Sequence, residues 1–376
     1  MAGIYIHIPF CRQACTYCNF HFSTLLKNKA PFINALISEI SLPQQFIDES
    51  QPIETIYFGG GTPSLLVDDE INNILKAIKD RFLIDANVEI TLETNPDDVN
   101  EKVLDQWQTT GINRLSLGIQ SFNEEELKWM NRAHNATQAM QSLAWIKKAG
   151  FNNYSVDLIY GSPLLSNDDF KRNTEIIFKN EVPHVSCYAL TVEPKTLLNK
   201  LIETKKTLPI NTDKQAEQFE LLMKWMNENG LEHYEISNFA KPCMRSRHNS
   251  SYWQGKPYFG FGPSAHSYNG KNIRRWNIAN NSLYIKSIEE SIVPYEEEIL
   301  TEHQQLNEFI MISLRTMEGI NIKKLEYLFG EKYLTSLMKK AKSFIASGSI
   351  VCVNNQLQLT SKGKFLADGI AAAMFV

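Results

Sequence analysis

The stretch Pro9-Phe10-Cys11-Arg12-Gln13-Ala14-Cys15-Thr16-Tyr17-Cys18-Asn19-Phe20 places three of the six cysteines of this 376-residue chain within eight residues. It follows the alternating segment Ile4-Tyr5-Ile6-His7-Ile8, which predicts a strand, so the cysteines lie in the loop after that strand. Three thiolates can hold three irons of a [4Fe-4S] cube and leave the fourth iron open to another ligand. The spacing therefore predicts a cluster that takes part in chemistry.

Two other interpretations of Cys11, Cys15 and Cys18 stay open at this point, a zinc site completed by His7 or His21 and three unligated thiols. Structural zinc usually takes paired cysteine knuckles from two places, and this chain has no second pair. The remaining cysteines are scattered and are expected to be small buried hydrophobic residues: Cys187, Cys243 and Cys352.

The composition is that of an ordinary globular protein, with 43% apolar residues, 21% charged residues and a formal net charge of -4. This balance argues against nucleic acid or an anionic membrane surface as a partner. The first residues predict a strand rather than a signal peptide, and no apolar run approaches the roughly 20 residues that a membrane-spanning helix needs. We expect a cytoplasmic protein, where reduced and clustered thiols favour metal over disulfides.

Predicted strands alternate with predicted helices over about the first 236 residues. The strands cover 4–8, 53–58, 88–94, 114–119, 154–159, 184–190 and 233–236. Helical periodicity appears from about 30 to 42, around 71–78, before Gly111, and over 137–149, 168–178 and 213–229. Such alternation implies right-handed crossovers and a mostly parallel sheet. Six or seven units would build a complete or incomplete barrel, and a doubly wound open sheet is the alternative.

Unusual residues follow the predicted strands. They are the three cysteines, Gly59-Gly60-Gly61, Glu93, Gln120, Asp157 and Thr191. Loops at the carboxyl ends of parallel barrel strands open on one face, so these residues are expected to converge there. The pattern therefore favours the barrel.

The last third of the chain differs in composition. Residues 238–281 are irregular and rich in glycine and aromatic residues, and we expect strands that extend the sheet and a loop surface. Helices are predicted over 306–317, 325–329 and 334–347, followed by a hairpin over 350–359 that turns at Asn354-Asn355 and gives a winged-helix-like unit. The expected domains are a partial barrel (1–237), a sheet extension with a motif loop (238–298) and a small α+β domain (299–376).

Several motifs together resemble a known superfamily. They are the cysteine loop with Tyr17, Gly59-Gly60-Gly61-Thr62-Pro63, Glu93-Thr94-Asn95-Pro96, Leu117-Gly118-Ile119-Gln120-Ser121-Phe122, Asn131-Arg132 and Val156-Asp157-Leu158-Ile159-Tyr160-Gly161. The chain is similar to the radical S-adenosylmethionine (SAM) superfamily and, within it, to the oxygen-independent coproporphyrinogen III dehydrogenases and their heme-chaperone relatives. The resemblance implies an incomplete parallel (βα)6-type, TIM-like barrel.

The resemblance also implies roles for individual residues. Cys11, Cys15 and Cys18 would hold the [4Fe-4S] cluster, and SAM would take the open iron. Its implied SAM-binding positions are Tyr5 near the cluster, Tyr17 beside the adenine, Gly60, Gly61 and Thr62 at the methionine part, and Glu93, Gln120, Arg132, Asp157 and Thr191. Carboxylates would suit the amino group and ribose hydroxyls, and Arg132 would suit the SAM carboxylate.

Two branches of this group differ in features that the sequence contains. The dehydrogenases carry a further cysteine at the position of Phe20 and an extension before the cysteine strand, and this chain starts almost at that strand. The segment His248-Asn249-Ser250-Ser251-Tyr252-Trp253 fits the His-Asn-x-x-Tyr-Trp signature of the heme-chaperone branch, where the histidine is implicated in heme binding. We therefore expect a heme chaperone, and the radical SAM dehydrogenase, which decarboxylates coproporphyrinogen III oxidatively, is the alternative.

The residue types near this segment suit heme. Imidazole of His248 could ligate iron, and Tyr252 and Trp253 could lie against the porphyrin. Arg245, Arg247 or Lys256 could pair with the propionates, and His266 is a second candidate ligand. The expected partners are heme and acceptor hemoproteins of respiratory membranes, and the sequence leaves open whether the chain forms a homodimer.

Overall fold

The computed structural model describes residues 1–43 and 46–376. Six strands lie side by side and run parallel, in the order in which they occur in the chain. They are β1 (Ala2–Ile8), β2 (Ile53–Gly60), β3 (Ile84–Thr94), β4 (Arg114–Gln120), β5 (Tyr154–Tyr160) and β6 (His184–Ala189). In the part of the chain that the structure describes, β6 does not pair with β1, so the barrel is open. The predicted incomplete parallel barrel is confirmed.

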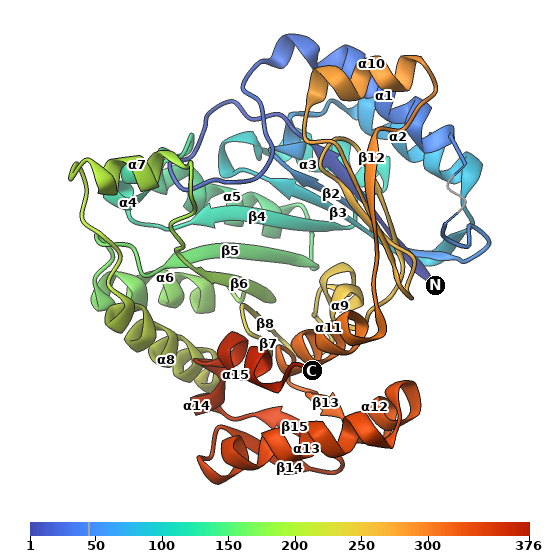
Figure 1. Cartoon of the computed structure of the whole chain (residues 1–376). Helices are drawn as coiled ribbons and strands as arrows, with labels where there is room; N and C mark the ends of the chain where they lie inside the picture. The colour runs from blue at the N-terminus through green and yellow to red at the C-terminus, as the bar shows by residue number, and fades with distance from the viewer. Residues whose placement is uncertain (44–45) are drawn as a thin grey trace.

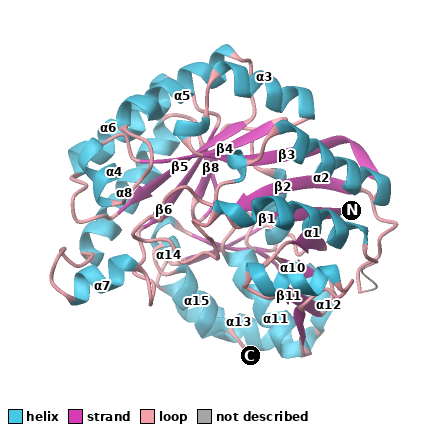
Figure 2. Cartoon of the chain, turned by 90° about the horizontal axis from the view of Figure 1, so that it is seen from above, coloured by secondary structure: helices cyan, strands magenta, loops and turns pink. Residues whose placement is uncertain are grey.

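Helices connect these strands and surround the sheet (Figure 2). They are α1 (Lys29–Ser41), α2 (Asp68–Arg81), α3 (Glu101–Thr110), α4 (Glu124–Trp129), α5 (Ala136–Lys148), α6 (Asn167–Lys179), α7 (Leu197–Glu203) and α8 (Thr212–Glu228). Short 3-10 turns cover Leu26–Asn28, Pro63–Leu65 and Pro96–Asp98. Helix α2 buries Ile71, Ile74, Leu75 and Ile78 at helical spacing, which is the amphipathic pattern that its sequence predicts.

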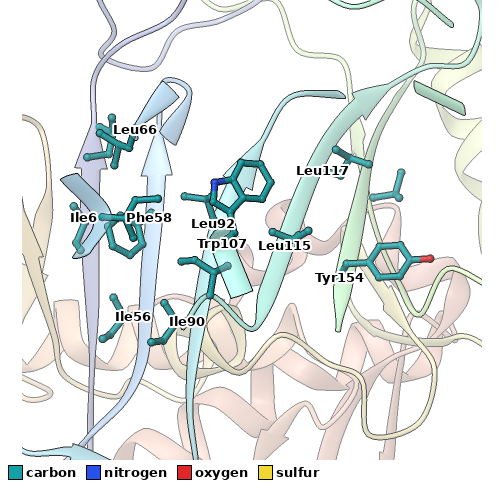
Figure 3. Packing of buried hydrophobic residues seen from close by; sticks show 14 of the residues in the cluster. Ile6, Ile56, Phe58, Leu66, Ile90, Leu92, Trp107, Leu115, Leu117 and Tyr154 are labelled. Carbon is teal, nitrogen blue, oxygen red and sulfur yellow. The ribbon is translucent and has the colours of Figure 1, made fainter. Parts of the chain in front are cut away.

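The two faces of the parallel sheet differ in chemistry because side chains alternate along each strand. Ile6, Phe58, Leu92 and Leu115 belong to one buried hydrophobic core, and Figure 3 shows them with Trp107 of α3. The alternate positions on the opposite face carry polar groups: Tyr5, Tyr57, Glu93, Ser116 and Asp157. The helix-covered face therefore supplies the core, and the inner face supplies the polar side chains of a site.

Both edges of the parallel sheet are extended. On the β1 side follow β9 (Tyr258–Phe261), which is parallel to β1, and then antiparallel β10 (His266–Tyr268), β11 (Ile273–Asn277) and β12 (Tyr295–Ile299). On the β6 side follow antiparallel β8 (Asn238–Ala240) and β7 (Glu232–Glu235). The strand predicted over 233–236 is found as β7, and it joins the sheet through β8 because the chain reverses directly from β7 into β8.

The segment that carries the His-Asn-x-x-Tyr-Trp signature is a helix, α9 (Arg247–Trp253), and not the expected loop. The Ser246 hydroxyl accepts a hydrogen bond from the N–H of Asn249 and caps the first turn. A second helix of this region, α10 (Asn281–Glu289), packs against α1. The expectation of added strands in this region is confirmed.

The C-terminal segment has its own hydrophobic core and a small three-stranded sheet, which lies at the bottom of Figure 1. Its elements are α11 (Glu302–Leu314), β13 (Ile320–Asn321), α12 (Ile322–Phe329), α13 (Glu331–Ala346), β14 (Ile350–Val353), β15 (Gln356–Leu359), α14 (Ser361–Lys364) and α15 (Ala367–Met374). The hairpin turns at Asn354 and Asn355 as predicted, with φ of 49° and 61°. The domain boundaries at 237/238 and 298/299 stay predictions.

The scattered cysteines behave differently from one another. Cys187 is buried in β6 as expected, but Cys243 and Cys352 are exposed. Cys243 follows β8 in a turn with φ of 66°, and Cys352 lies on β14 opposite Leu357 of β15. Among the described residues, no helix combines the length and hydropathy that crossing a membrane requires.

Candidate functional site

Backbone hydrogen bonds tie the cysteine loop to neighbouring segments. The N–H of Cys11 donates to the carbonyl of Ser23 at 3.0 Å, and the N–H of Thr16 donates to the carbonyl of Met130 at 3.0 Å. The thiols of the loop are free and half-buried, and burial raises the pKa of Cys18 to about 11. Such a thiol keeps its proton at neutral pH in the absence of a metal, and a metal that binds the thiolate would displace this proton.

A first cavity of about 920 Å³ opens beside this loop. The predicted cluster- and SAM-binding residues that line it are Cys11, Cys15, Tyr17, Cys18, Gly60, Gly61, Thr62, Glu93, Gln120, Arg132, Asp157 and Thr191. They come from the carboxyl-terminal parts of neighbouring parallel strands and the loops that follow, as a barrel requires. Residues that are far apart in the sequence therefore meet in one place.

The positions of three of these residues differ in detail from the prediction. Glu93 is the second-last residue of β3, Asp157 lies in the middle of β5, and Gln120 is the last residue of β4, so none of them follows its strand. They reach the cavity because they occupy inward-facing positions of the strands themselves. Glu93 and Asp157 are thus held on regular strand backbone, whereas Gln120 has a φ of 66° at an irregular end of β4.

Arg132 connects the cysteine loop with the sheet. Its Nη1 donates to Sγ of Cys15 at 3.3 Å, and its Nη2 donates to Oδ1 of Asn95 at 2.6 Å and to the carbonyl of Gly118 at 2.7 Å. Its Nε is buried and has no hydrogen-bond partner among the described residues. A guanidinium with a free donor on the wall of a cavity is suited to an incoming carboxylate.

Glu93 and Asp157 are buried carboxyl groups in the same cavity. Glu93 accepts hydrogen bonds from the hydroxyl of Tyr57 at 2.8 Å and from the N–H of Gly60 at 3.1 Å. Burial raises the pKa of Glu93 to about 7, against the effect of the Tyr57 bond, and burial raises the pKa of Asp157 to about 6. Both groups are therefore poised to bind a cationic or hydroxyl-rich ligand near neutral pH.

Gly60 and Gly61 bring backbone close to the cysteine loop. A Cβ at Gly61 would lie 2.7 Å from the carbonyl oxygen of Phe10, and a Cβ at Gly60, where φ is 112°, would lie 2.7 Å from the His7 ring. Side chains are excluded at both positions, so the cavity wall here consists of backbone groups. With the free donor of Arg132 and the three thiols of the loop, these features fit the [4Fe-4S] cluster and SAM.

The C-terminal segment also lines the first cavity, which the sequence did not predict. Its contributions are Arg315 and the run from Lys364 to Gly369. Nζ of Lys364 donates to Nδ1 of His233 at 2.9 Å, and burial lowers the pKa of Lys364 to about 8. The local sequence pattern carries no sign of this contact, because the two residues lie 131 positions apart in the chain.

Tyr5 is not among the residues of the first cavity. Its ring stacks on Tyr57 with centroids 6.1 Å apart, and its hydroxyl is 3.1 Å from Nδ1 of His7. Tyr5 instead lines a second cavity, of about 1090 Å³, together with Tyr252 and Trp253. The two cavities share Asn19 and Phe20 at the end of the cysteine loop.

His248 is buried and lines neither cavity. Its Nδ1 is 2.8 Å from Oγ1 of Thr55, its Nε2 is 2.8 Å from the hydroxyl of Tyr252, and its ring stacks on Tyr57 at 4.9 Å. Burial lowers the pKa of His248 to about 3, so the ring is neutral. His248 is thus a core residue in this structure, and two hydroxyl groups occupy its two ring nitrogens.

The other groups predicted to face heme divide into two sets. Lys256 lines the second cavity and is paired with Glu54 at 2.7 Å, and His266 lines it as well. Arg245 is paired with Glu318 at 2.7 Å away from both cavities, and Arg247 donates to the backbone carbonyl of Asn87. The guanidinium groups of Arg245 and Arg247 are therefore already engaged in intramolecular contacts.

Comparisons with known proteins agree with this arrangement. The radical SAM superfamily model matches residues 5–176, and the HemN C-terminal domain model matches residues 300–366. Proteins named heme chaperone HemW are similar over nearly the whole chain, with 33% identity in Lactococcus lactis (97% of each chain) and 33% in Bacillus subtilis (99% of each).

The similarity extends to a solved structure. Coproporphyrinogen III oxidase (HemN) from Escherichia coli, a radical SAM enzyme, is similar in fold with a TM-score of 0.85 and 21% identity, over 100% of this chain and 90% of that one. The barrel, the C-terminal unit and the full-length similarity lead to one assignment. The chain belongs to the HemW family of the radical SAM superfamily.

Proposed function

We propose that this protein binds heme and passes it to acceptor hemoproteins of respiratory membranes. Its relatives over the full length carry the name heme chaperone, and Phe20 stands where the dehydrogenases have a further cysteine. The observation that carries the proposal is the position of α9: two of its signature residues, Tyr252 and Trp253, line a large cavity next to the cysteine loop. A heme site beside a cluster site is the arrangement that the function needs.

The first cavity would hold the [4Fe-4S] cluster on Cys11, Cys15 and Cys18, and SAM beside it. The cluster with SAM on its fourth iron would supply redox chemistry to this site. Arg132 offers its free Nε to a carboxylate, and Glu93 and Asp157 offer oxygen atoms to amino or hydroxyl groups. We place this work in the cytoplasm, where the thiols stay reduced.

His248 lies outside the second cavity and contacts a residue of its wall. Because its Nε2 is bound to the hydroxyl of Tyr252, it holds that ring in the cavity wall. Direct ligation of heme iron by His248 stays a prediction, and it requires Tyr252 to turn away first.

The test is a pair of anaerobic assays on the full chain after reconstitution of the cluster. Protein loaded with hemin should transfer heme to an apo-hemoprotein, and incubation with SAM and coproporphyrinogen III should give no protoporphyrinogen. Iron and sulfide analysis checks the cluster, since a zinc site would give a colourless protein with neither. Formation of protoporphyrinogen without heme transfer would assign the dehydrogenase activity instead.

A further inference from the structure

Below the first cavity, the inner face of the parallel sheet carries a second set of polar side chains. Alternate residues of a strand face the same side, so the residues two positions before the cavity-lining ones also face inward. Leu115 and Leu117 of β4 belong to the core on the other side (Figure 3). The inward-facing residues of this set are all buried and form what we call the polar layer: Thr91 of β3, Arg114 of β4, Ser155 of β5 and His184 of β6.

Arg114 is the cation of the polar layer. It is 2% exposed, and its Nε has no hydrogen-bond partner among the described residues. No carboxylate of residues 1–43 and 46–376 forms an ion pair with it. Burying an unpaired charge costs free energy. Because no close counter-ion neutralises this charge, its electrostatic field reaches the other groups around it.

The neighbouring groups low in the barrel do not neutralise Arg114. The carboxylate of Glu89 accepts the N–H of Arg247 at 3.0 Å and the N–H of His248 at 3.2 Å, so it serves the first turn of α9. Burial and the charge of Arg114 lower the pKa of His184, so this ring is neutral at neutral pH. The charge of Arg114 is therefore directed at the groups above it.

Asp157 lies on the cavity side of the polar layer, on the strand next to that of Arg114. Its carboxylate oxygens are 3.3 and 3.5 Å from Oγ of Ser116, which is 2.9 Å from Oγ of Ser155 in the polar layer. Burial raises the pKa of Asp157 to about 6, while the hydroxyl of Ser186 and the charge of Arg114 act in the opposite direction. Arg114 thus offsets part of the effect of burial.

Other titratable groups surround Asp157, and they differ in charge. Burial and the charge of Asp157 raise the pKa of Glu93. Arg132 attracts Asp157, but its guanidinium is also hydrogen-bonded to the cysteine loop and to the sheet. Three more groups are neutral at neutral pH because burial raises their pKa: Tyr57, Cys187 and Tyr188. Among the described residues, Arg114 is thus the cation near Asp157 that has no other polar contact.

We propose that Arg114 is a positioning residue of the first cavity, which holds Asp157 as a carboxylate from below so that Asp157 can accept hydrogen bonds from the hydroxyl groups of SAM. A protonated Asp157 would present a donor in place of one of its acceptors. The inference deepens the proposed function and rests on it for the identity of the ligand. The ionisation of Asp157 itself is a property of the chain and can be measured without cluster or SAM.

The first experiment titrates Asp157 in the full chain without the cluster. Carbon-13 NMR of carboxyl-labelled aspartate follows the ionisation, and Asp157→Asn identifies the signal. Arg114→Met removes the charge and should make Asp157 about tenfold weaker as an acid. Arg114→Lys keeps the charge and should restore most of the acidity, which a merely structural role of the guanidinium would not do.

The matched control is Arg172→Met, the same substitution at an exposed arginine of α6, which should leave the titration of Asp157 as in wild type. A buried cation can often be replaced by an apolar residue without loss of stability. Circular dichroism checks the fold, and Arg114→Gln is the second neutral variant. An unchanged Asp157 signal in a folded neutral variant would overturn the proposal, as would equal weakening of the acid in Arg114→Lys and Arg114→Met.

The second experiment measures SAM affinity of the cluster-loaded chain by calorimetry at two pH values. Arg114→Met should bind SAM about fivefold more weakly than wild type at pH 6 and like wild type at pH 8.5, where Asp157 is ionised in both proteins. Equal affinities at both pH values would also overturn the proposal. Absence of SAM binding by the wild-type protein would instead contradict the proposed function of the first cavity, and the titration of Asp157 would still decide the role of Arg114.

Discussion

At the residue scale, His248 is held in the core by contacts on both sides of its ring. Its ring is enclosed by Tyr5 and Tyr57 and bonded to Thr55 and Tyr252. Truncation leaves a cavity and two unpaired hydroxyl groups, so His248→Ala should lower the free energy of unfolding by roughly 2–4 kcal/mol without any heme present. Urea denaturation of the heme-free protein measures this loss.

Tyr252→Phe removes only the hydrogen bond to Nε2 of His248 and should lower the free energy of unfolding by about 1 kcal/mol. Glu220→Gln, at the surface of α8, should leave the unfolding curve unchanged and is the control. If His248→Ala is as stable as wild type, the ring does not belong to the core as described. Heme-binding data for this variant would then need no correction for stability.

Glu93 gives the stability of the protein a pH dependence. Because burial raises its pKa to about 7 in the folded state, the folded chain keeps a proton that the unfolded chain has already lost. The resulting stabilisation is complete below the ordinary pKa of a glutamic acid and is lost as pH rises through about 7. Glu93→Gln should abolish a change on the order of 3 kcal/mol between pH 5 and 8.

The measurement is the free energy of unfolding of the cluster-free protein across this pH range. Glu220→Gln, an exposed substitution on α8, is the control and should retain the wild-type slope. Parallel curves for wild type and Glu93→Gln would show that the Glu93 proton is not retained on folding.

At the scale of elements, the buried carboxylate of Glu39 links α1 to the sheet extension through hydrogen bonds. Glu39 accepts hydrogen bonds from the N–H of Gly262 at 2.7 Å, from Asn277 at 2.6 Å and from the hydroxyl of Tyr284 on α10 at 2.5 Å. Glu39→Ala leaves three buried donors unpaired and should destabilise the protein by roughly 3–5 kcal/mol. Glu39→Gln keeps one acceptor oxygen and should cost less.

Chemical denaturation gives the two free energies, and amide hydrogen exchange locates the effect. Exchange should increase most in α10 and around Gly262, because these parts are held by Glu39. Equal stability of Glu39→Ala and wild type would mean that the apolar contacts between α1 and α10 suffice without it.

Elements with a regular pattern could be predicted from the sequence, and those set by distant contacts could not. The apolar residues of α2 recur at helical spacing, and those of β1 alternate with polar ones, so both elements could be predicted directly. The superfamily motifs identified the residues of the first cavity. Helix α9 has only seven residues, which is too short for a clear helical pattern, and the Ser246 cap marks where it begins. The burial of His248 depends on Thr55, which lies 193 positions away in the chain. No local pattern encodes such a contact.

At the scale of the whole molecule, the C-terminal segment completes the first cavity. Backbone hydrogen bonds join it to the barrel, from Ile236 to Arg315 at 3.1 Å and from Met317 to Tyr234 at 3.0 Å. The ring of Phe365 packs edge-on against Phe219 of α8 at 5.1 Å, and both residues line the cavity. Ligand binding in the barrel and docking of this segment should therefore support each other.

The substitution Phe365→Ala tests this coupling. Loss of the ring opens the cavity wall and removes its contact with Phe219, so SAM should bind the cluster-loaded protein on the order of tenfold more weakly, which corresponds to about 1.4 kcal/mol. Isothermal titration calorimetry measures the affinity. The matched control is Phe344→Ala, which truncates a ring of the C-terminal core that does not line the cavity. If both variants weaken SAM binding equally, general loosening of the C-terminal segment is the cause; an effect of Phe365→Ala alone assigns it to the cavity wall.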